Sequence, residues 1–569
     1  MGEATGGEER PIVLEVRDLV THFPVRNGVV KAVDGVSFTL RQGETLCIVG
    51  ESGSGKSVTA RSILQIVDMP GRIVSGSVIL HRGGTSVDLA RLNPRGKEIR
   101  AVRGAAIAMI FQEPMSSLSP VHTVGDQIGE VLRLHLKMTK SQARARCIEL
   151  LKQVEIPNPD RAIDRYTFEF SGGMRQRVMI AMALACNPIL LIADEPTTAL
   201  DVTTQAEILD LIRRLQKEHG MAVMFITHDM GVVAEIADKV LVMHYGKVKE
   251  SGPLDQIFHA PQDEYTKMLI GSVLKLEQKA EIRLKRAPIP SDAAPVVSVR
   301  GLQMHFGPQG SGVKAVDGVS LDLFPGETLG IVGESGSGKT TMGRCILRVN
   351  DPTGGAIQYR RADGSLVDIV GADKATLRSC RREIRMIFQD PIGSLNPRMT
   401  VAQVIGEPLL VNEIASGKEL DDRVADLMQQ VGLEPAWRER YPHAFSGGQR
   451  QRIGIARAIA LNPRVIVADE ATSALDVSLR AQMLDLMMSL QDKLGLSYIF
   501  ISHDISVIRY MCDRVAVMYR GKLVEIGTAD KVCNDPDHPY TKSLLSAIPR
   551  PDPRHRRMHE RFRYAGETQ

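Results

Sequence analysis

The sequence contains one domain twice. KAVDGVSFTL at residues 31–40 returns as KAVDGVSLDL at 314–323, and MIFQEP at 109–114 returns as MIFQDP at 386–391. Three more pairs follow in the same order: FSGGMRQR with FSGGQRQR, IADEPTTALD with VADEATSALD, and FITHD with FISHD. The offset between the copies changes only slightly along the chain, so small insertions and deletions separate them. A repeat of this size indicates a duplicated domain and excludes a solenoid of short repeats.

A chain of 569 residues is too long for one hydrophobic core and should form several domains. The duplication indicates where their boundaries lie. We predict a first domain over residues 1–275, a linker over 276–295, a second domain over 296–549 and a basic tail over 550–569. The linker is charged, then rich in Pro and Ala, and it lacks apolar periodicity. The tail is predicted to be solvated, with contact to lipid headgroups as the alternative. Its arginines are Arg550, Arg554, Arg556, Arg557, Arg561 and Arg563.

Each copy alternates short apolar strands with helical stretches. In the first copy, TLCIVG is followed by a glycine-rich turn and KSVTARSILQIV, and later by PILLIADEP, AVMFITHD and KVLVMHYG. This alternation predicts an α/β fold with a mostly parallel sheet covered on both faces. The most apolar stretch, at residues 178–193, is too short to span a bilayer and has Asn187-Pro188 in its middle. We therefore expect a buried helix, a stop and a buried strand there.

Composition narrows the class of protein. With 43% hydrophobic and 24% charged residues the chain is typical of soluble proteins, and a net charge of +4 gives no bulk attraction to nucleic acid. The seven cysteines are scattered without a C-x-x-C pair, which predicts reduced thiols in the cytosol and neither disulfides nor zinc. The start MGEATGGEER predicts no secretory signal, and Gly6 does not fit a myristoylation site.

GESGSGKS at 50–57 and GESGSGKT at 333–340 each follow an apolar strand. In G-x-x-x-x-G-K-[ST] the glycines let backbone N–H groups converge on phosphate oxygens, and the start of the next helix adds its dipole. Lys56 and Lys339 are predicted to reach the β and γ phosphates. Ser57 and Thr340 are predicted to supply a hydroxyl to Mg²⁺. A single match could arise by chance, but two in equivalent positions leave that explanation little room.

Two apolar runs end in paired acids, LLIADE and VIVADE. A buried strand ending in bare Asp-Glu would leave charge in a low-dielectric site unless a cation met it, so we assign Asp194 and Asp469 to Mg²⁺. Glu195 and Glu470 are then placed to polarise the water that attacks the γ phosphate. A solvated strand end is the alternative. Each acidic pair, however, follows its Ser-Gly-Gly motif at the same spacing in both copies.

His228 and His503 each follow an apolar strand, at the same spacing after the candidate base in both copies. An isolated histidine there is more often a core residue, but the repeated spacing favours a bond to the γ phosphate and the attacking water. Gln112 and Gln389 carry both a donor and an acceptor without charge, which suits contact with Mg²⁺ and water.

Ser171 and Ser446 are predicted N-cap residues of helices that begin with Gly-Gly. Such a helix directs its positive end at an anion. A merely well-capped helix is the alternative. Each copy, however, already has one phosphate loop for its own nucleotide, so a second phosphate-binding turn needs a nucleotide from elsewhere.

These motifs, in this order and over nearly the whole chain, resemble the nucleotide-binding domains of ABC transporters, which belong to the P-loop NTPases and carry a helical subdomain. The resemblance implies an ATPase in which each ATP lies between the P-loop of one copy and the Ser-Gly-Gly signature of the other. It also implies that Phe23 and Phe306, which precede the two P-loops at the same spacing, stack on adenine; either could equally be core.

The resemblance distributes the remaining residues over two sites. One site would combine Phe23, Gly50, Ser52, Gly53, Gly55, Lys56, Ser57, Val58, Gln112, Asp194, Glu195 and His228 with Ser446, Gly447, Gly448 and Gln449. The other would combine Phe306, Gly333, Ser335, Gly336, Gly338, Lys339, Thr340, Thr341, Gln389, Asp469, Glu470 and His503 with Ser171, Gly172, Gly173 and Met174. Mg²⁺ in each site would be held by Ser57, Gln112 and Asp194, or by Thr340, Gln389 and Asp469.

Finer features are similar to the ATP-binding subunits of bacterial peptide, nickel and glutathione importers. These features are FQEPMSSLSP, FQDPIGSLNP and the extensions APQDEYTKMLIGSV and DPDHPYTKSLLSAIP. The resemblance implies two transmembrane permease subunits and a periplasmic or extracellular solute-binding protein as partners, at the cytoplasmic face of the inner membrane. It places the permease-binding groove in the helical insertions at residues 113–168 and 390–445. Many single-copy members bind an iron–sulfur cluster through cysteines after the extension; RPDPRHRRMHERFRY has none, so we expect no cluster.

Two rival functions remain. One is a soluble duplicated ABC ATPase of the translation-factor type, but those proteins join their halves by a long charged helix, whereas this linker is short and contains proline. The other is a regulatory module, which requires a broken site. The copies differ by Ala471 in place of Pro196 and by Met174 in place of Gln449. Neither change removes a charged or metal-binding group, so we predict two competent sites.

Overall fold

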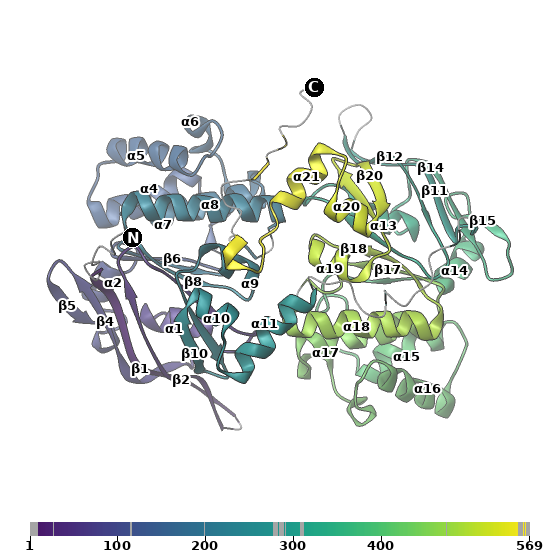
Figure 1. The fold of residues 1–569 in the computed structure, drawn as a ribbon, viewed down its shortest axis with the longest axis horizontal. Coiled ribbons are helices and arrows are strands. Elements are labelled where there is room, and N and C mark those ends of the chain that lie inside the picture. The colour runs from purple at the N-terminus through teal and green to yellow at the C-terminus, as the bar shows by residue number, and fades with distance from the viewer. Residues whose placement is uncertain are drawn as a thin grey trace, which may run out of the picture. The chain divides into compact units, whose positions relative to one another are not determined.

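A computed structural model describes residues 10–26, 28–113, 117–198, 200–276, 283, 290, 292–307, 312–473, 475–555, 561, 562 and 564. The chain divides into two compact units (Figure 1). The first comprises Met1–Gly271 with Pro549–Glu560, and the second comprises Ser272–Ile548 with Arg561–Gln569. Most of the predicted linker, Pro114 of the first MIFQEP motif, and Arg556, Arg557 and Arg563 of the predicted tail lie outside the described residues.

The first unit contains two sheets. An antiparallel sheet has the order β2-β1-β4-β5, and a six-stranded sheet has the order β10-β9-β3-β8-β7-β6. In the six-stranded sheet only β10 is antiparallel to its neighbour. The strands are β1 Ile12–Val25, β2 Gly28–Arg41, β3 Thr45–Val49, β4 Arg72–Arg82, β5 Thr85–Asp88, β6 Ile107–Ile110, β7 Leu190–Asp194, β8 Ala222–Ile226, β9 Lys239–His244 and β10 Lys247–Pro253.

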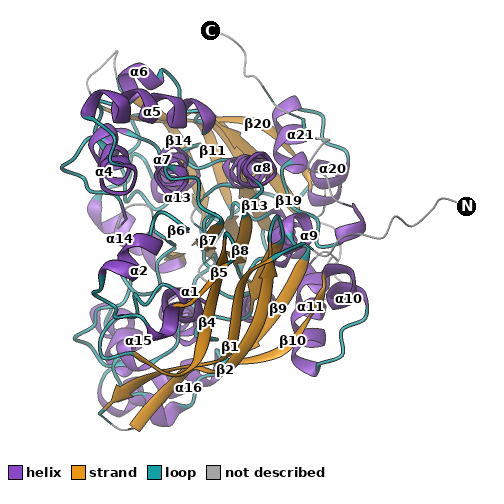
Figure 2. Cartoon of the chain, turned by 90° about the vertical axis from the view of Figure 1, so that its left-hand side faces the viewer, coloured by secondary structure: helices purple, strands orange, loops and turns teal. Residues whose placement is uncertain are grey.

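The helices of the first unit cover its six-stranded sheet and form the helical insertion predicted after Gln112. They are α1 Lys56–Ile63, α2 Lys97–Val102, α4 Val124–Leu136, α5 Lys140–Gln153, α6 Pro159–Ala162, α7 Gly172–Leu184, α8 Val202–His219, α9 Met230–Ile236 and α10 Leu254–His259. A further helix, α11 Glu264–Leu276, begins in the first unit, and its residues from Ser272 onward belong to the second unit. Figure 2 shows α4, α5 and α6 at the opposite end of this unit from the β1–β2 ribbon. The predicted helical insertion is therefore confirmed, as is the helix, stop and strand over residues 178–193.

The second unit repeats this plan, with sheet orders β12-β11-β14-β15 and β16-β17-β18-β13-β19-β20. Its strands are β11 Val297–Phe306, β12 Val313–Leu323, β13 Thr328–Val332, β14 Gly354–Arg360, β15 Leu366–Asp368, β16 Ile384–Ile387, β17 Val465–Asp469, β18 Ser497–Ile501, β19 Arg514–Tyr519 and β20 Lys522–Thr528. Its helices are α13 Lys339–Ile346, α14 Lys374–Glu383, α15 Val401–Val411, α16 Gly417–Gln430, α17 Gly447–Ile459, α18 Val477–Leu494, α19 Ile505–Met511, α20 Ala529–Asn534 and α21 Pro539–Ser546.

The helix after each P-loop packs between the two sheets of its unit. In the second unit, Met342, Cys345 and Ile346 of α13 share one buried core with residues of β11, β12, β13 and β17. The strands at the centre of the parallel sheets are buried along their whole length, which holds for β3, β7, β8, β13, β17 and β18. The mostly parallel α/β fold is confirmed, and the antiparallel sheet was not predicted. None of the described helices is both long and apolar enough to cross a membrane.

Candidate ATP sites

The first P-loop, residues 50–57, joins the carboxyl end of β3 to α1. Its backbone is confined by close contacts that only glycine allows. A Cβ on Gly50 would lie 2.1 Å from the carbonyl oxygen of Met243, and a Cβ on Gly55 would lie 2.1 Å from that of Ala32. Both glycines also have positive φ, 148° and 98°. The loop is therefore fixed from both sheets, with Met243 at the end of β9 and Ala32 on β2.

The P-loop lysine is buried and folded back onto its own loop. Lys56 is 5% exposed, and its Nζ donates to the carbonyl oxygens of Gly50 and Glu51 at 2.7 and 2.9 Å. Lys339 makes the same bonds to Gly333 and Glu334 at 2.8 and 2.7 Å. The ammonium thus lies at the centre of each loop, where the sequence predicts phosphate.

The hydroxyl and the first acid that were assigned to Mg²⁺ lie together. Ser57 Oγ donates to Asp194 Oδ1 at 2.8 Å, and Thr340 Oγ1 donates to Asp469 Oδ1 at the same distance. Burial raises the pKa of Asp194 and of Asp469, although the hydroxyl bond opposes this shift. A buried carboxylate beside a hydroxyl supplies the hard oxygen ligands that Mg²⁺ prefers.

Glu195 lies just past the end of β7, with the other predicted side chains around it. Its Oε2 accepts from Gln112 Nε2 at 2.9 Å and from the Thr198 hydroxyl at 3.0 Å, and its Oε1 lies 3.2 Å from His228 Nδ1. Burial by itself raises the pKa of Glu195. The hydrogen bond and charge of His228, however, bring the pKa below its ordinary value. The carboxylate is therefore ionised at neutral pH and able to accept a proton.

Glu470 has nearly the same surroundings in the second copy. Gln389 Nε2 donates to it at 2.7 Å, and His503 Nδ1 lies 3.2 Å from its Oε1. Ser473 differs from its counterpart Thr198, because its hydroxyl donates to the backbone carbonyl of Glu470 rather than to the carboxylate. Both glutamates have φ of 46°, a left-handed conformation that is uncommon for a residue other than glycine.

The signature turns form the predicted helix caps. Ser171 accepts a hydrogen bond from the N–H of Met174 at the start of α7, and Ser446 accepts one from the N–H of Gln449 at the start of α17. Gln449 also accepts from the Ser446 N–H at 3.0 Å and completes a capping box, which Met174 has no side-chain oxygen to form.

The predicted adenine-stacking residues lie on the antiparallel sheets. Phe23 pairs with Val30 on β2, two residues before Ala32, whose carbonyl oxygen confines Gly55. Phe306 occupies the equivalent place on β11, opposite Val313, and is 44% exposed.

The structure adds one residue in each copy that the sequence had not singled out. The hydroxyl of Tyr265, in α11, accepts a hydrogen bond from the P-loop N–H of Glu51 at 3.2 Å. The hydroxyl of Tyr540, in α21, accepts one from Glu334 at 3.0 Å. Both tyrosines stand in a repeated Tyr-Thr-Lys sequence, at the same offset between the copies as the two histidines, which was the available signal.

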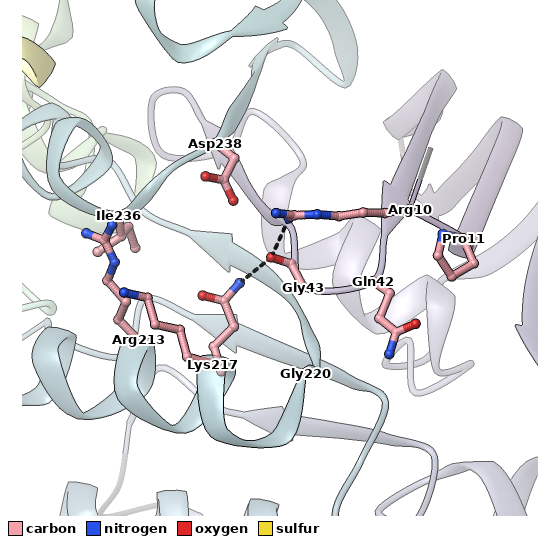
Figure 3. Close-up of a pocket in the computed structure, with 10 residues that line it drawn as sticks. Arg10, Pro11, Gln42, Gly43, Arg213, Lys217, Gly220, Ile236 and Asp238 are labelled. Atoms are coloured by element: carbon pink, nitrogen blue, oxygen red, sulfur yellow. Dashed lines mark hydrogen bonds between the residues drawn. The ribbon is translucent and has the colours of Figure 1, made fainter. Parts of the chain in front are cut away.

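A cavity of about 440 Å³ lies elsewhere in the first unit (Figure 3). Gln42, Gly220 and Asp238 place it at the amino ends of the parallel strands, whereas the P-loop lies at their carboxyl ends. Arg10 and Lys217 add positive charge to its lining. No residue predicted to bind nucleotide lines this cavity.

Comparisons with known proteins show the family of the chain. The family model described as ABC transporter matches residues 33–198 and 316–473. The chain belongs to the ABC transporter family. A second model, described as the C-terminal region of oligopeptide/dipeptide transporters, matches residues 249–295 and 524–565.

Curated relatives match almost the whole length of this chain. The glutathione import ATP-binding protein GsiA of Shigella flexneri is 50% identical over 96% of this chain and 91% of its own length. Its namesake in Escherichia coli strain K12 has the same values, and that of Pectobacterium atrosepticum is 49% identical over 96% and 90%. The chain is thus an ATP-binding subunit of an ABC importer and an ATPase, and the translation-factor alternative is not supported.

Solved structures include similar single domains. A dimeric post-hydrolysis state of the ATP-binding cassette MJ0796 bound to ADP and Pi is 29% identical, with a TM-score of 0.37 over 41% of this chain and 98% of that chain. CbiO1 from Clostridium perfringens is 26% identical, with a TM-score of 0.38 over 44% and 95%.

The Glu470–His503 pair predicts a shifted histidine titration. Burial lowers the pKa of His503, but the hydrogen bond and charge of Glu470 outweigh burial, so the pKa lies above 6.5. We expect NMR of the ring protons to show this shift and Glu470→Gln to lower the pKa. Asp535→Asn, a change on an exposed segment, should leave it unchanged.

The sign of the stability effect follows from the raised pKa. The protonated His503 contributes its full stabilisation below the pKa of the unfolded state and loses that contribution as pH rises through the folded pKa, whereas the contribution of Glu470, whose pKa is lowered, is lost as pH falls. A His503 pKa at or below 6.5 in the unmodified protein would contradict the electrostatic role of Glu470.

Proposed function

We propose that the chain binds two ATP molecules, each between the P-loop of one copy and the signature turn of the other, and that both sites hydrolyse ATP. The observation that carries this proposal is that each copy contains the same complete set of bonds around its P-loop, acids and histidine. Each copy also has a capped signature helix whose free N–H groups suit a phosphate. Closure of the copies on ATP and reopening after hydrolysis would drive the permease.

Mg²⁺ fits the oxygen ligands present in both copies. Ser57 and Asp194 would hold it in the first copy and Thr340 and Asp469 in the second, and Gln112 and Gln389 would each offer an amide oxygen as a further ligand. The bound ion would neutralise charge on the β and γ phosphates. We propose no iron–sulfur cluster, because the sequence after the second extension contains no cysteine.

Glu195 and Glu470 would act as general bases. Each is ionised and fixed by an amide donor and a histidine, so it can accept a proton from the attacking water. His228 and His503 would orient that water and the γ phosphate. Phe23 and Phe306 would stack on the adenine rings, which leaves the P-loops to bind the phosphates.

Replacing either base tests the catalytic assignment. We expect Glu195→Gln and Glu470→Gln each to reduce hydrolysis at their own site by about 10²- to 10⁴-fold while ATP still binds, because the amide keeps the shape but cannot accept the proton. Single-turnover hydrolysis and equilibrium binding of ATP would measure the two effects.

The copies provide their own control for this experiment. If Glu195→Gln left activity intact while Glu470→Gln abolished it, the proposed equivalence of the sites would be wrong.

Thiol cross-linking tests the shared sites. In a variant with all seven native cysteines replaced, and with Glu195→Gln and Glu470→Gln to retain ATP, we expect Ser52→Cys to cross-link with Ser446→Cys only when ATP is present. A short bifunctional thiol reagent and mass spectrometry would detect the product. Ser52→Cys paired with Ser171→Cys, in the same copy, is the matched control. ATP-dependent linkage of the control pair in place of the first would overturn the arrangement.

The proposed setting is the cytoplasmic face of a bacterial inner membrane. Two transmembrane permease subunits would dock on the helical insertions, and a periplasmic or extracellular solute-binding protein would deliver the solute. The cargo would be glutathione, a small peptide or a related solute. Support comes from the relatives, which are named for glutathione import, and from the match to oligopeptide/dipeptide transporters.

Reconstitution tests the partnership. We expect ATPase activity to rise severalfold when the protein is combined with its neighbouring permease pair in lipid vesicles together with the loaded binding protein. The same vesicles with unloaded binding protein are the control. Activity that is indifferent to the permease would contradict the importer assignment.

A further inference from the structure

We propose that Tyr265 and Tyr540 are positioning residues of the two ATP sites, through which the C-terminal extension of each copy fixes the P-loop of the same copy. The inference rests on the proposed nucleotide binding at these loops. It assigns a task to the part of the chain that matches the C-terminal region of oligopeptide/dipeptide transporters.

Hydrogen bonds attach the extension of the first copy to β10, an edge strand of the six-stranded sheet. The carboxylate of Glu250, on β10, accepts hydrogen bonds from the N–H groups of Gln262 and Asp263 at 2.9 and 3.1 Å. Asp263 Oδ1 in turn accepts from the Tyr265 N–H at 2.8 Å. The chain therefore enters α11 in a fixed path, and Tyr265 lies in its first turn.

The second copy has the same hydrogen bonds to a carboxylate, but a different residue accepts from the tyrosine N–H. Glu525, on β20, accepts from the N–H groups of Asp537 and His538 at 2.8 and 3.1 Å. His538 Nδ1 replaces the aspartate as acceptor for the Tyr540 N–H, at 3.1 Å. Both copies keep these hydrogen bonds although the residue that accepts from the tyrosine N–H differs. This indicates that the function of the arrangement is to place the tyrosine.

An aromatic contact then sets the direction of each tyrosine ring. His244, the last residue of β9, stacks on Tyr265 with ring centroids 4.0 Å apart and planes 18° apart. Tyr519, the last residue of β19, lies 4.3 Å from Tyr540. The preceding residues, Met243 and Met518, supply the carbonyl oxygens that occupy the space a Cβ atom on the first P-loop glycine would need. One strand end thus supports both the loop and the tyrosine that bonds to it.

The tyrosine hydroxyl and the P-loop lysine bind the two backbone polar groups of one P-loop residue. The N–H of Glu51 donates to Tyr265, while its carbonyl oxygen accepts from Lys56. The second copy repeats both bonds at Glu334. If the lysine turned to a phosphate it would leave the carbonyl, and Glu51 would then be held by the tyrosine bond at its N–H and by the Ser54 N–H, which donates to its carbonyl oxygen at 3.1 Å. The hydroxyl should therefore matter most in the nucleotide-bound loop.

Removal of one oxygen tests this role. Tyr265→Phe keeps the ring and its stacking but leaves the Glu51 N–H without that acceptor. With Lys339→Ala present to disable the other loop, we expect the Kd for a fluorescent ATP analogue to rise about five- to tenfold. Hydrogen exchange at the Glu51 amide should also become faster. The kcat should change by less than about twofold, because the loop grips phosphates in both ground and transition states.

Matched controls separate this role from general stability. Tyr245→Phe removes a hydroxyl from a 79% exposed tyrosine whose ring also contacts His244, and it should leave the Kd unchanged. In the second copy, Tyr540→Phe with Lys56→Ala should weaken binding in the same way.

The outcomes are distinguishable. A lower unfolding temperature for Tyr265→Phe with an unchanged Kd would show a structural role only and overturn the inference. If Lys56→Ala and Lys339→Ala together failed to weaken ATP binding, the proposed nucleotide sites themselves would be wrong.

Discussion

Close backbone packing around each P-loop is the constraint on which the rest of the structure depends. The carbonyl oxygens of Met243 and Ala32 occupy the space that side chains at positions 50 and 55 would need. Met518 and Ala315 do the same at positions 333 and 338, at 2.2 and 2.0 Å. These contacts come from both sheets of each unit. This packing therefore restricts the path of each loop at its first glycine and at the glycine before its lysine.

Much of this arrangement could be predicted because it is encoded locally. A buried strand, a glycine-rich turn and a helix follow one another directly along the chain, and the paired acids end a strand that lies in the same sheet. The carboxyl ends of parallel strands lie at one edge, so Ser57, Asp194, Glu195 and His228 meet there. Repetition in the second copy strengthened each assignment.

Other features depend on distant pairing and left little local signal. The antiparallel sheet joins β1 to β4 with register shifts that disturb the alternation of apolar residues. Tyr265 bonds to a residue 214 positions earlier, and Tyr540 to one 206 positions earlier. Only the recurrence of Tyr-Thr-Lys could have indicated these contacts, and recurrence alone does not identify a partner. Small differences between the copies, such as the roles of Thr198 and Ser473, also required side-chain geometry.

The inward-folded lysines have a consequence for nucleotide exchange. The Lys56 ammonium donates to two carbonyl oxygens of its own loop. In the proposed mechanism, nucleotide binding would therefore exchange one set of oxygen acceptors for another, and product release would reverse that exchange without a change in the path of the loop.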